Sequence, residues 1–184
     1  MSVSNTVASV VVGVLIGSVV KVFTGPVITV PSFSSAEVVE TNVLRVEADD
    51  GMSVIEGISE RDFTRVLAAI RYVESNNDPN VKDGDGGKAI GVYQIWEDYW
   101  KDAAEYGNMT GTYQDCRDPK YADKTVRNYM PRYCTSKRLG RKPMLKDIAF
   151  MHVGGPKAPW ATGKKLENCE IHWGKVQKVL KIIR

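Results

Sequence analysis

Cysteine is scarce in this 184-residue chain, and the number of cysteines is odd. With only Cys116, Cys134 and Cys169 present, the chain lacks the residues for a dense disulfide scaffold. In an exported protein, three cysteines predict one disulfide and one spare thiol, with Cys116–Cys134 and Cys134–Cys169 both open as pairings. In a reducing compartment all three would be packing residues. A catalytic cysteine is not predicted, because nothing marks either histidine as its base.

Spacings typical of metal sites and nucleic-acid readers are also missing. Asp83 and Asp85 stand in a glycine-rich segment, but the glutamate that a calcium loop needs twelve positions along is absent. No zinc-finger spacing, recognition-helix pattern or single-strand-binding motif accompanies the net charge of +3. We therefore predict no metal site, no cofactor and no nucleic-acid partner.

The chain has no uninterrupted apolar run of full membrane-spanning length. Residues 7–20 are almost wholly apolar, yet a span needs roughly 20 residues. A snorkelling Lys21 could extend the run to Phe23, which gives a possible membrane contact over residues 7–23. The first six residues contain no basic residue, unlike a typical signal peptide. An uncleaved anchor, a removed signal and a buried hydrophobic arm all stay open.

The composition divides the chain into three parts. Residues 1–24 are predicted to be the anchor or signal segment. Residues 25–52 carry two prolines, scattered acids and no helical period, and are predicted to be a tether. Residues 53–184 are long and apolar enough for one catalytic domain, and they hold the excess of basic residues. The oligomeric state is left open.

One glutamate stands at the edge of a predicted helical face. Apolar residues recur at steps of three and four before it, namely Phe63, Val66, Leu67, Ile70 and Val73. Glu74 follows Ile70 by four positions, so it falls at the border of the buried side. Partial burial disfavours the charged form, so we predict a raised pKa and assign Glu74 as a general acid.

A second carboxylate is expected shortly after this helix. Cleavage of a glycosidic bond uses one carboxylic acid to protonate the leaving oxygen and one carboxylate to support the anomeric carbon or activate water. Asp78 precedes a proline and is predicted to begin a turn. Asp83 and Asp85 precede residues 89–95, which alternate like a short strand of a hairpin. Both remain candidates on this reasoning.

Four ordered motifs in residues 70–176 resemble the invertebrate-type (destabilase-like) lysozymes and their bacterial and phage relatives. They are Val73-Glu74-Ser75, the run Gly91-Val92-Tyr93-Gln94-Ile95 with Tyr99-Trp100-Lys101-Asp102-Ala103, the segment 125–133, and the segment 149–156 followed by His172-Trp173-Gly174-Lys175-Val176. The resemblance implies a mostly helical α+β lysozyme-like fold, with a small β-hairpin sheet beside the catalytic helix. It also implies Asp85, six residues before Gly91, as the second carboxylate, with Asp83 as the alternative.

The same resemblance suggests substrate-binding residues and shows departures from the pattern. Tyr93 and Gln94 are predicted to line the cleft, although Tyr93 as strand packing is an alternative. Ser75, His152 and Gly154 are further candidates, with a cap for Ser75 and a structural histidine for His152 as alternatives. Val153 replaces an asparagine and His172 a tyrosine of the family motifs. Trp96, Trp100 and Trp173 are predicted to be core residues.

Further helices follow from local signals. Ser59 with Asp62 predicts the start of the first helix, and Asp118-Pro119 the start of another whose inward side is Ala122, Val126, Tyr129 and Tyr133. Pro131 is expected to kink or end that helix. Two more helices are predicted over residues 145–151 and 171–183.

Taken with the resemblance, these features predict a lysozyme-like glycosidase that cleaves β-1,4 bonds of peptidoglycan or a chitin-like polymer. One alternative is a lytic transglycosylase that uses Glu74 alone. Another is a non-catalytic wall-binding or structural shell protein on the same fold. The expected location is secreted or membrane-anchored, with the catalytic domain outside the cytosol, and a virion-associated enzyme is one option.

Overall fold

The computed structural model describes residues 54–183. The predicted anchor or signal segment at residues 1–24 and the tether at residues 25–52 lie outside the described residues. Among the helices that are described, none combines the length and apolar character of a membrane span.

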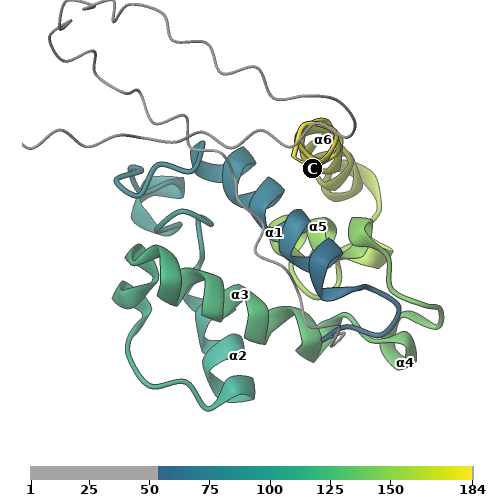
Figure 1. The fold of residues 1–184 in the computed structure, drawn as a ribbon, viewed down its shortest axis with the longest axis horizontal. Coiled ribbons are helices and arrows are strands. Elements are labelled where there is room, and N and C mark those ends of the chain that lie inside the picture. Colours follow the sequence, from purple (N-terminus) through teal and green to yellow (C-terminus); the bar gives the residue numbers. More distant parts are fainter. Residues whose placement is uncertain (1–53, 184) are drawn as a thin grey trace, which may run out of the picture. The chain divides into compact units, whose positions relative to one another are not determined.

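Six α-helices and three short 3-10 turns make up the described part (Figure 1). The helices are α1 (Glu60–Ser75), α2 (Glu97–Gly107), α3 (Pro119–Tyr133), α4 (Ser136–Leu139), α5 (Leu145–Gly154) and α6 (Gly163–Leu180). The 3-10 turns are η1 (Asp85–Gly87), η2 (Tyr113–Arg117) and η3 (Ala158–Trp160). The prediction of a mostly helical fold is confirmed for residues 54–183.

The predicted β-hairpin sheet is wrong for this chain. Residues 54–183 contain only isolated bridges, of which two, Gly84 with Ala89 and Ile90 with Ile95, fall in the expected hairpin. Between Ile90 and Ile95 the backbone reverses direction, with positive φ angles at Gly91 and Gln94. A strand needs extended backbone throughout, so this four-residue reversal interrupts the alternation that the sequence suggested.

Local signals explain the first helix. The Ser59 side chain accepts a hydrogen bond from the Asp62 backbone N–H at 3.1 Å, which satisfies one of the free donors at the helix start. Asn76 ends the helix in the left-handed conformation. Phe63, Val66, Leu67 and Ile70 are all buried, as their spacing predicted.

The helix predicted after Asp118 is α3, and Pro131 does not end it at once. Asp118 accepts hydrogen bonds from two backbone N–H groups of the first turn, and Pro119 occupies the first turn. Three of the four predicted inward residues, Ala122, Val126 and Tyr129, are buried. The helix continues past Pro131 to Tyr133.

Both C-terminal helices are longer than their patterns indicated. Helix α5 extends to Gly154 and therefore carries His152 on its last turn. Helix α6 begins at Gly163, well before the predicted residue 171, and its buried face is Cys169, His172 and Val176. The added residues of α5 matter for the site, because they place His152 on a helix as His172 is on α6.

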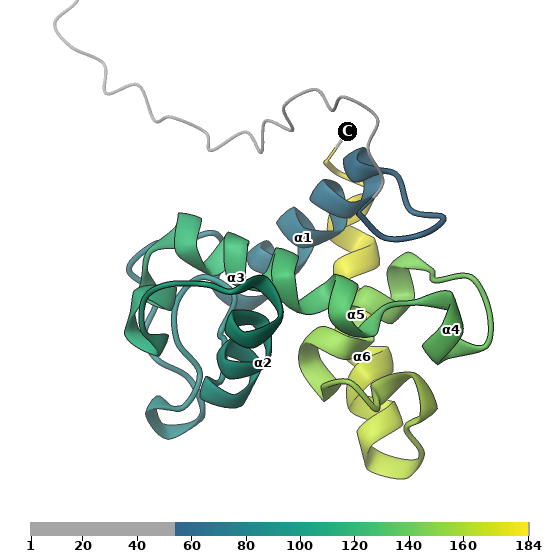
Figure 2. The ribbon, with the colours of Figure 1, turned by 90° about the horizontal axis from the view of Figure 1, so that it is seen from below.

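Helix α1 packs against α5 and α6, while α2 packs against α3 (Figures 1 and 2).

The three cysteines are all free and buried, so no disulfide forms among the described residues. Burial raises the pKa of the Cys116 thiol to about 11 and that of Cys134 to about 12. The expectation of one disulfide is thus not met, and the cysteines serve as packing residues.

Candidate active site

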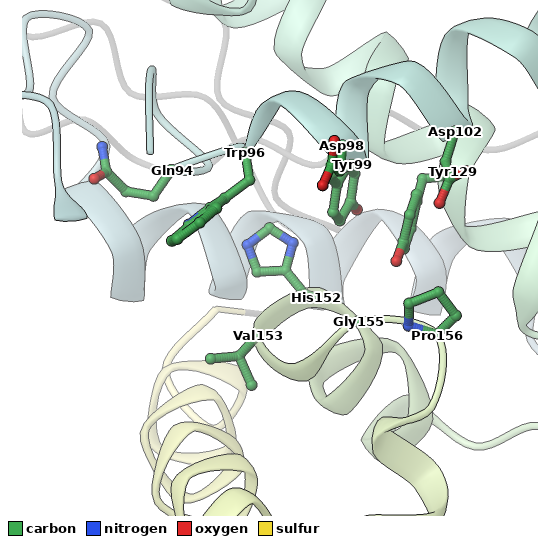
Figure 3. Close-up of a pocket in the computed structure, with 10 residues that line it drawn as sticks. All are labelled: Gln94, Trp96, Asp98, Tyr99, Asp102, Tyr129, His152, Val153, Gly155 and Pro156. Atoms are coloured by element: carbon green, nitrogen blue, oxygen red, sulfur yellow. The ribbon is translucent and has the colours of Figure 1, made fainter. Parts of the chain in front are cut away.

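Two adjoining pockets form a cleft between the segment 84–96, helix α2 and the end of helix α5. The first is lined by Glu74, Gly84, Asp85, Ala89, Gln94, Trp96, His152 and Val153. The second is lined by Gln94, Trp96, Asp98, Tyr99, Asp102, Tyr129, His152, Val153, Gly155 and Pro156 (Figure 3). Four residues are common to both pockets, so the cleft is continuous.

Glu74 reaches the first pocket from the last turn of α1. Its Oε1 lies 2.8 Å from His172 Nε2 on α6 and 3.8 Å from His152 Nε2 on α5. The Glu74 side chain is 20% exposed, whereas both histidine side chains are almost fully buried. Three packed helices therefore hold this carboxylate in place.

The prediction of a raised pKa at Glu74 is wrong. Burial by itself raises the pKa of this carboxyl group, and the prediction rested on burial alone. The hydrogen bond from His172, together with the charges of the nearby histidines and Lys175, outweighs burial and leaves the pKa below its ordinary value. The prediction failed because the sequence does not show that His172, 98 residues further along the chain, contacts Glu74.

His152, on the last turn of α5, lines both pockets of the cleft. Its Nε2 is 3.0 Å from the backbone carbonyl of Tyr93, which can only accept, so Nε2 carries the hydrogen. Burial lowers the pKa of His152 to about 4, which keeps the ring neutral near pH 7. Figure 3 shows the ring rising from α5 below Trp96 and toward α2.

Asp85 lines the same pocket as Glu74 and comes from the segment 84–96. It begins the 3-10 turn η1 with a left-handed φ of 47°, a conformation that aspartate tolerates better than most residues. Its Oδ2 accepts a hydrogen bond from the indole N–H of Trp96 at 3.2 Å. Unlike Glu74, Asp85 is exposed and its side chain makes no hydrogen bond to a histidine among the described residues.

Asp83 lines neither of these pockets. Both of its oxygens bind the Arg117 guanidinium, one of them at 2.8 Å. The hydrogen bond from Arg117 lowers the pKa of Asp83. Asp83 therefore ties the segment 84–96 to the turn η2 (Tyr113–Arg117).

The backbone between Asp85 and Trp96 has little freedom. A methyl group at Gly91 would lie 1.9 Å from the Cys116 carbonyl oxygen, so only glycine fits there. The Gln94 side chain donates to the Gly91 carbonyl at 3.0 Å and fills the space beside Gly84. These contacts fix the turn that presents Asp85 and Trp96.

The structure brings together four of the seven predicted site residues, namely Glu74, Asp85, Gln94 and His152. The other three line neither pocket. Tyr93 is buried and its hydroxyl donates to Asp123 at 2.8 Å, while the Ser75 hydroxyl donates to the Arg71 carbonyl at 2.9 Å. Gly154 packs against Ala158 and Cys169, and its neighbour Gly155 lines the second pocket instead.

Two residues with clear places at the site were not predicted. Trp96, expected in the core, is 46% exposed and lines both pockets. His172 was not singled out, although Cys169, His172 and Val176 share one face of a helix at steps of three and four.

Comparison with known proteins adds two matches. The family model Destabilase matches residues 64–172. A solved structure, the inhibitor-bound lysozyme from Meretrix lusoria, is similar at 26% sequence identity and a TM-score of 0.50, over 69% of this chain and 92% of that chain. No curated protein sequence matches. These findings confirm the predicted enzyme class, a lysozyme-like glycosidase, and the chain belongs to the destabilase family.

Proposed function

We propose that this glycosidase cleaves the β-1,4 bonds of peptidoglycan or a related amino-sugar polymer, with Glu74 as general acid and Asp85 as nucleophile or electrostatic partner. The observation that carries the proposal is that these two carboxyl groups, in unlike surroundings, line one pocket. Unlike surroundings let one group hold a proton while the other stays ionised. Two-carboxylate glycoside cleavage requires that difference.

Glu74 is the better acid because its position is fixed and partly screened from water. Among the described residues, Oε1 accepts a hydrogen bond from His172 Nε2, and Oε2 has no hydrogen-bond partner. The free oxygen is the one available to a leaving glycosidic oxygen. Since the pKa of Glu74 is lowered, the protonated form is more abundant at acid pH, and we expect an acid optimum.

The residues shared by both pockets are suited to a chain of sugars. The exposed Trp96 ring offers a flat face for stacking, and the Gln94 amide and the His152 ring lie beside it. Tyr93, Ser75 and Gly154 act indirectly, because each supports the backbone or packing beneath the cleft. A polymer spanning both pockets would place one bond beside Glu74.

A cell-wall substrate places the catalytic domain outside the cytosol. The predicted hydrophobic segment at residues 7–23 would then serve export or anchoring. Fractionation of cells that produce the full chain, before and after removal of residues 1–24, tests this part of the proposal separately from catalysis.

The decisive experiment measures reducing-end release by the full chain from purified peptidoglycan and, separately, from chitin oligomers. Glu74→Gln removes the acid proton and is expected to lower turnover by about 10²–10⁴-fold. Asp85→Asn is expected to lower it by a similar factor, while Asp83→Asn serves as the matched control. The polymer that is cleaved identifies the substrate.

Each other outcome has a definite meaning. Activity that survives in Asp85→Asn, with anhydro-sugar products, would replace hydrolysis by lytic transglycosylation. An unmutated chain without turnover on either polymer, yet folded by circular dichroism, would reject the proposed reaction.

A further inference from the structure

The histidine on α6 contacts the proposed acid but is not one of the two carboxylates of the proposed mechanism. His172 is buried, with its side chain 8% exposed, and its Nε2 lies 2.8 Å from Glu74 Oε1. The two residues are far apart in the chain and meet because α1 packs on α6. The hydrogen bond is therefore a product of the tertiary fold.

The hydrogen on this bond can be assigned. An ionised carboxylate only accepts, so His172 Nε2 must donate to Glu74. The other ring nitrogen, Nδ1, is buried and has no hydrogen-bond partner among residues 54–183. A hydrogen on Nδ1 would be a buried unsatisfied donor, so Nε2 is the ring nitrogen whose hydrogen is satisfied in this environment.

The neighbouring histidine has the same arrangement. His152 donates from Nε2 to the Tyr93 carbonyl, and its Nδ1 is also buried without a partner among the described residues. The two imidazole rings stack, with centroids 6.1 Å apart and planes 26° from parallel. His152 thus braces the His172 ring from α5, and both Nε2 atoms lie on the Oε1 side of the carboxylate.

We propose that His172 is a positioning residue for the glycosidase reaction: by donating to Oε1, it leaves Oε2 as the oxygen that receives the catalytic proton and delivers it to the leaving group. This inference rests on the proposed function of Glu74. When Glu74 takes up a proton from solvent, Oε1 already accepts from His172, so the proton binds Oε2. During bond cleavage that proton moves to the glycosidic oxygen, and the ionised Glu74 keeps its bond from His172.

The bond also sets the pH range of activity. The charged or titratable groups that face Glu74 are His152 from α5, His172 and Lys175 from α6, and Asp85 across the pocket. Removal of the His172 donor leaves burial as the main influence, and burial raises the pKa of Glu74. A group that must be protonated to act then stays active to higher pH, so the alkaline limb of kcat/KM moves upward.

The test compares full pH profiles of kcat/KM for the full chain, His172→Phe and His172→Gln. The phenyl ring of His172→Phe keeps the approximate shape of the side chain and has no donor. We expect the alkaline limb of this variant to lie about one pH unit higher. The kcat of the variant at acid pH should fall about tenfold, because Oε1 of Glu74 is no longer held by a hydrogen bond. The glutamine amide can still donate, and its profile should lie close to that of the unmutated protein.

A pH profile of His172→Phe that superimposes on the unmutated profile would overturn the proposal. Should this variant fail to fold, His172→Met, which is also without an N–H, replaces it under the same criterion. Lys178→Gln, exposed on the next turn of α6, is the matched control and should leave the profile unchanged.

A substrate-free measurement separates this inference from the proposed function. The ¹³C shift of the Glu74 carboxyl group, followed by NMR through a pH titration, should report a higher pKa in His172→Phe than in the unmutated chain. If the chain cleaves neither polymer but shows this pKa difference, the proposed reaction is rejected and the effect of His172 on Glu74 is retained. Equal titration curves would reject the role of His172, whether or not the enzyme is active.

Discussion

Glu74 and Asp85 reach one pocket from two unlike parts of the molecule. Glu74 stands on a packed helix and accepts a hydrogen bond from His172 on α6, with His152 of α5 3.8 Å away. Asp85 stands on a 3-10 turn and is held by Trp96, eleven residues along the chain. One carboxylate therefore depends on long-range packing and the other on local backbone geometry. Substitutions in the helical packing around Glu74 and substitutions in the turn that carries Asp85 should therefore differ in their effects on stability and activity.

The largest loss of unfolding free energy is expected from a cavity beneath α1, the helix that carries Glu74. Phe63 is fully buried on α1, with the Arg127 guanidinium over its ring at 5.3 Å. Phe63→Ala should lower the free energy of unfolding by about 3–5 kcal/mol, because the lost contacts are only partly replaced. Urea denaturation measures this change. Tyr72→Ala, exposed on the same helix, should cost under about 0.5 kcal/mol; similar losses in both variants would show that α1 is not the packed support described here.

In the segment 84–96, which carries Asp85, the stability should be most sensitive to a substitution at Gly91. Gly91 and Gly86 have nearly the same φ, 68° and 67°, but only at Gly91 would a methyl group meet other atoms, namely the Cys116 backbone. Gly86→Ala is expected to cost roughly 1 kcal/mol through its positive φ alone. Gly91→Ala should cost roughly 1–3 kcal/mol more, because the backbone must move apart. Equal losses of unfolding free energy in the two variants would mean that the turn does not depend on its contact with Cys116.

This contrast also explains which parts of the fold could be predicted from sequence. The start of α1, its buried face and the start of α3 follow from capping residues and helical periodicity, and the structure agrees. These signals are local, since a helix satisfies its backbone within one segment. Residues 89–95 alternate like a strand, but the positive φ at Gln94 reverses the chain, and alternation alone does not report such a reversal.

The site was only partly predictable for the same reason. Glu74 could be placed on the border of a helical face, and the family resemblance singled out Asp85. The pKa direction of Glu74 was wrong because it depends on His172, a contact between distant segments. Trp96 was missed because its exposure depends on how the turn and α2 meet, which composition does not show.

Loss of the hydrogen bond from Trp96 to Asp85 should have a moderate effect on activity. Trp96→Phe keeps an aromatic ring for the sugar and removes the N–H that lies 3.2 Å from Asp85 Oδ2. We expect kcat/KM to fall about tenfold, the size of one hydrogen bond to a charged group, with little change in unfolding free energy. Trp160→Phe, which is similarly exposed but lines neither pocket, should keep full activity. An unchanged kcat/KM in Trp96→Phe would mean that Asp85 does not need this bond.

The smallest effect on activity is expected at the other aspartate of the turn, and it decides between the two candidates for the second carboxylate. Asp83 is engaged through both oxygens by Arg117 and lines neither pocket, so Asp83→Asn should keep kcat/KM within about threefold of the unmutated value, like other exposed ion pairs. The bond from Arg117 lowers the pKa of Asp83, so its contribution to stability is present above the ordinary pKa of aspartate and is lost as the pH falls through the lowered value. Thermal unfolding of Asp83→Asn and Arg117→Gln at neutral and strongly acid pH should therefore differ from that of the unmutated chain only at neutral pH. A loss of turnover in Asp83→Asn that matches Asp85→Asn, without a matching loss in Arg117→Gln, would move the second carboxylate from Asp85 to Asp83.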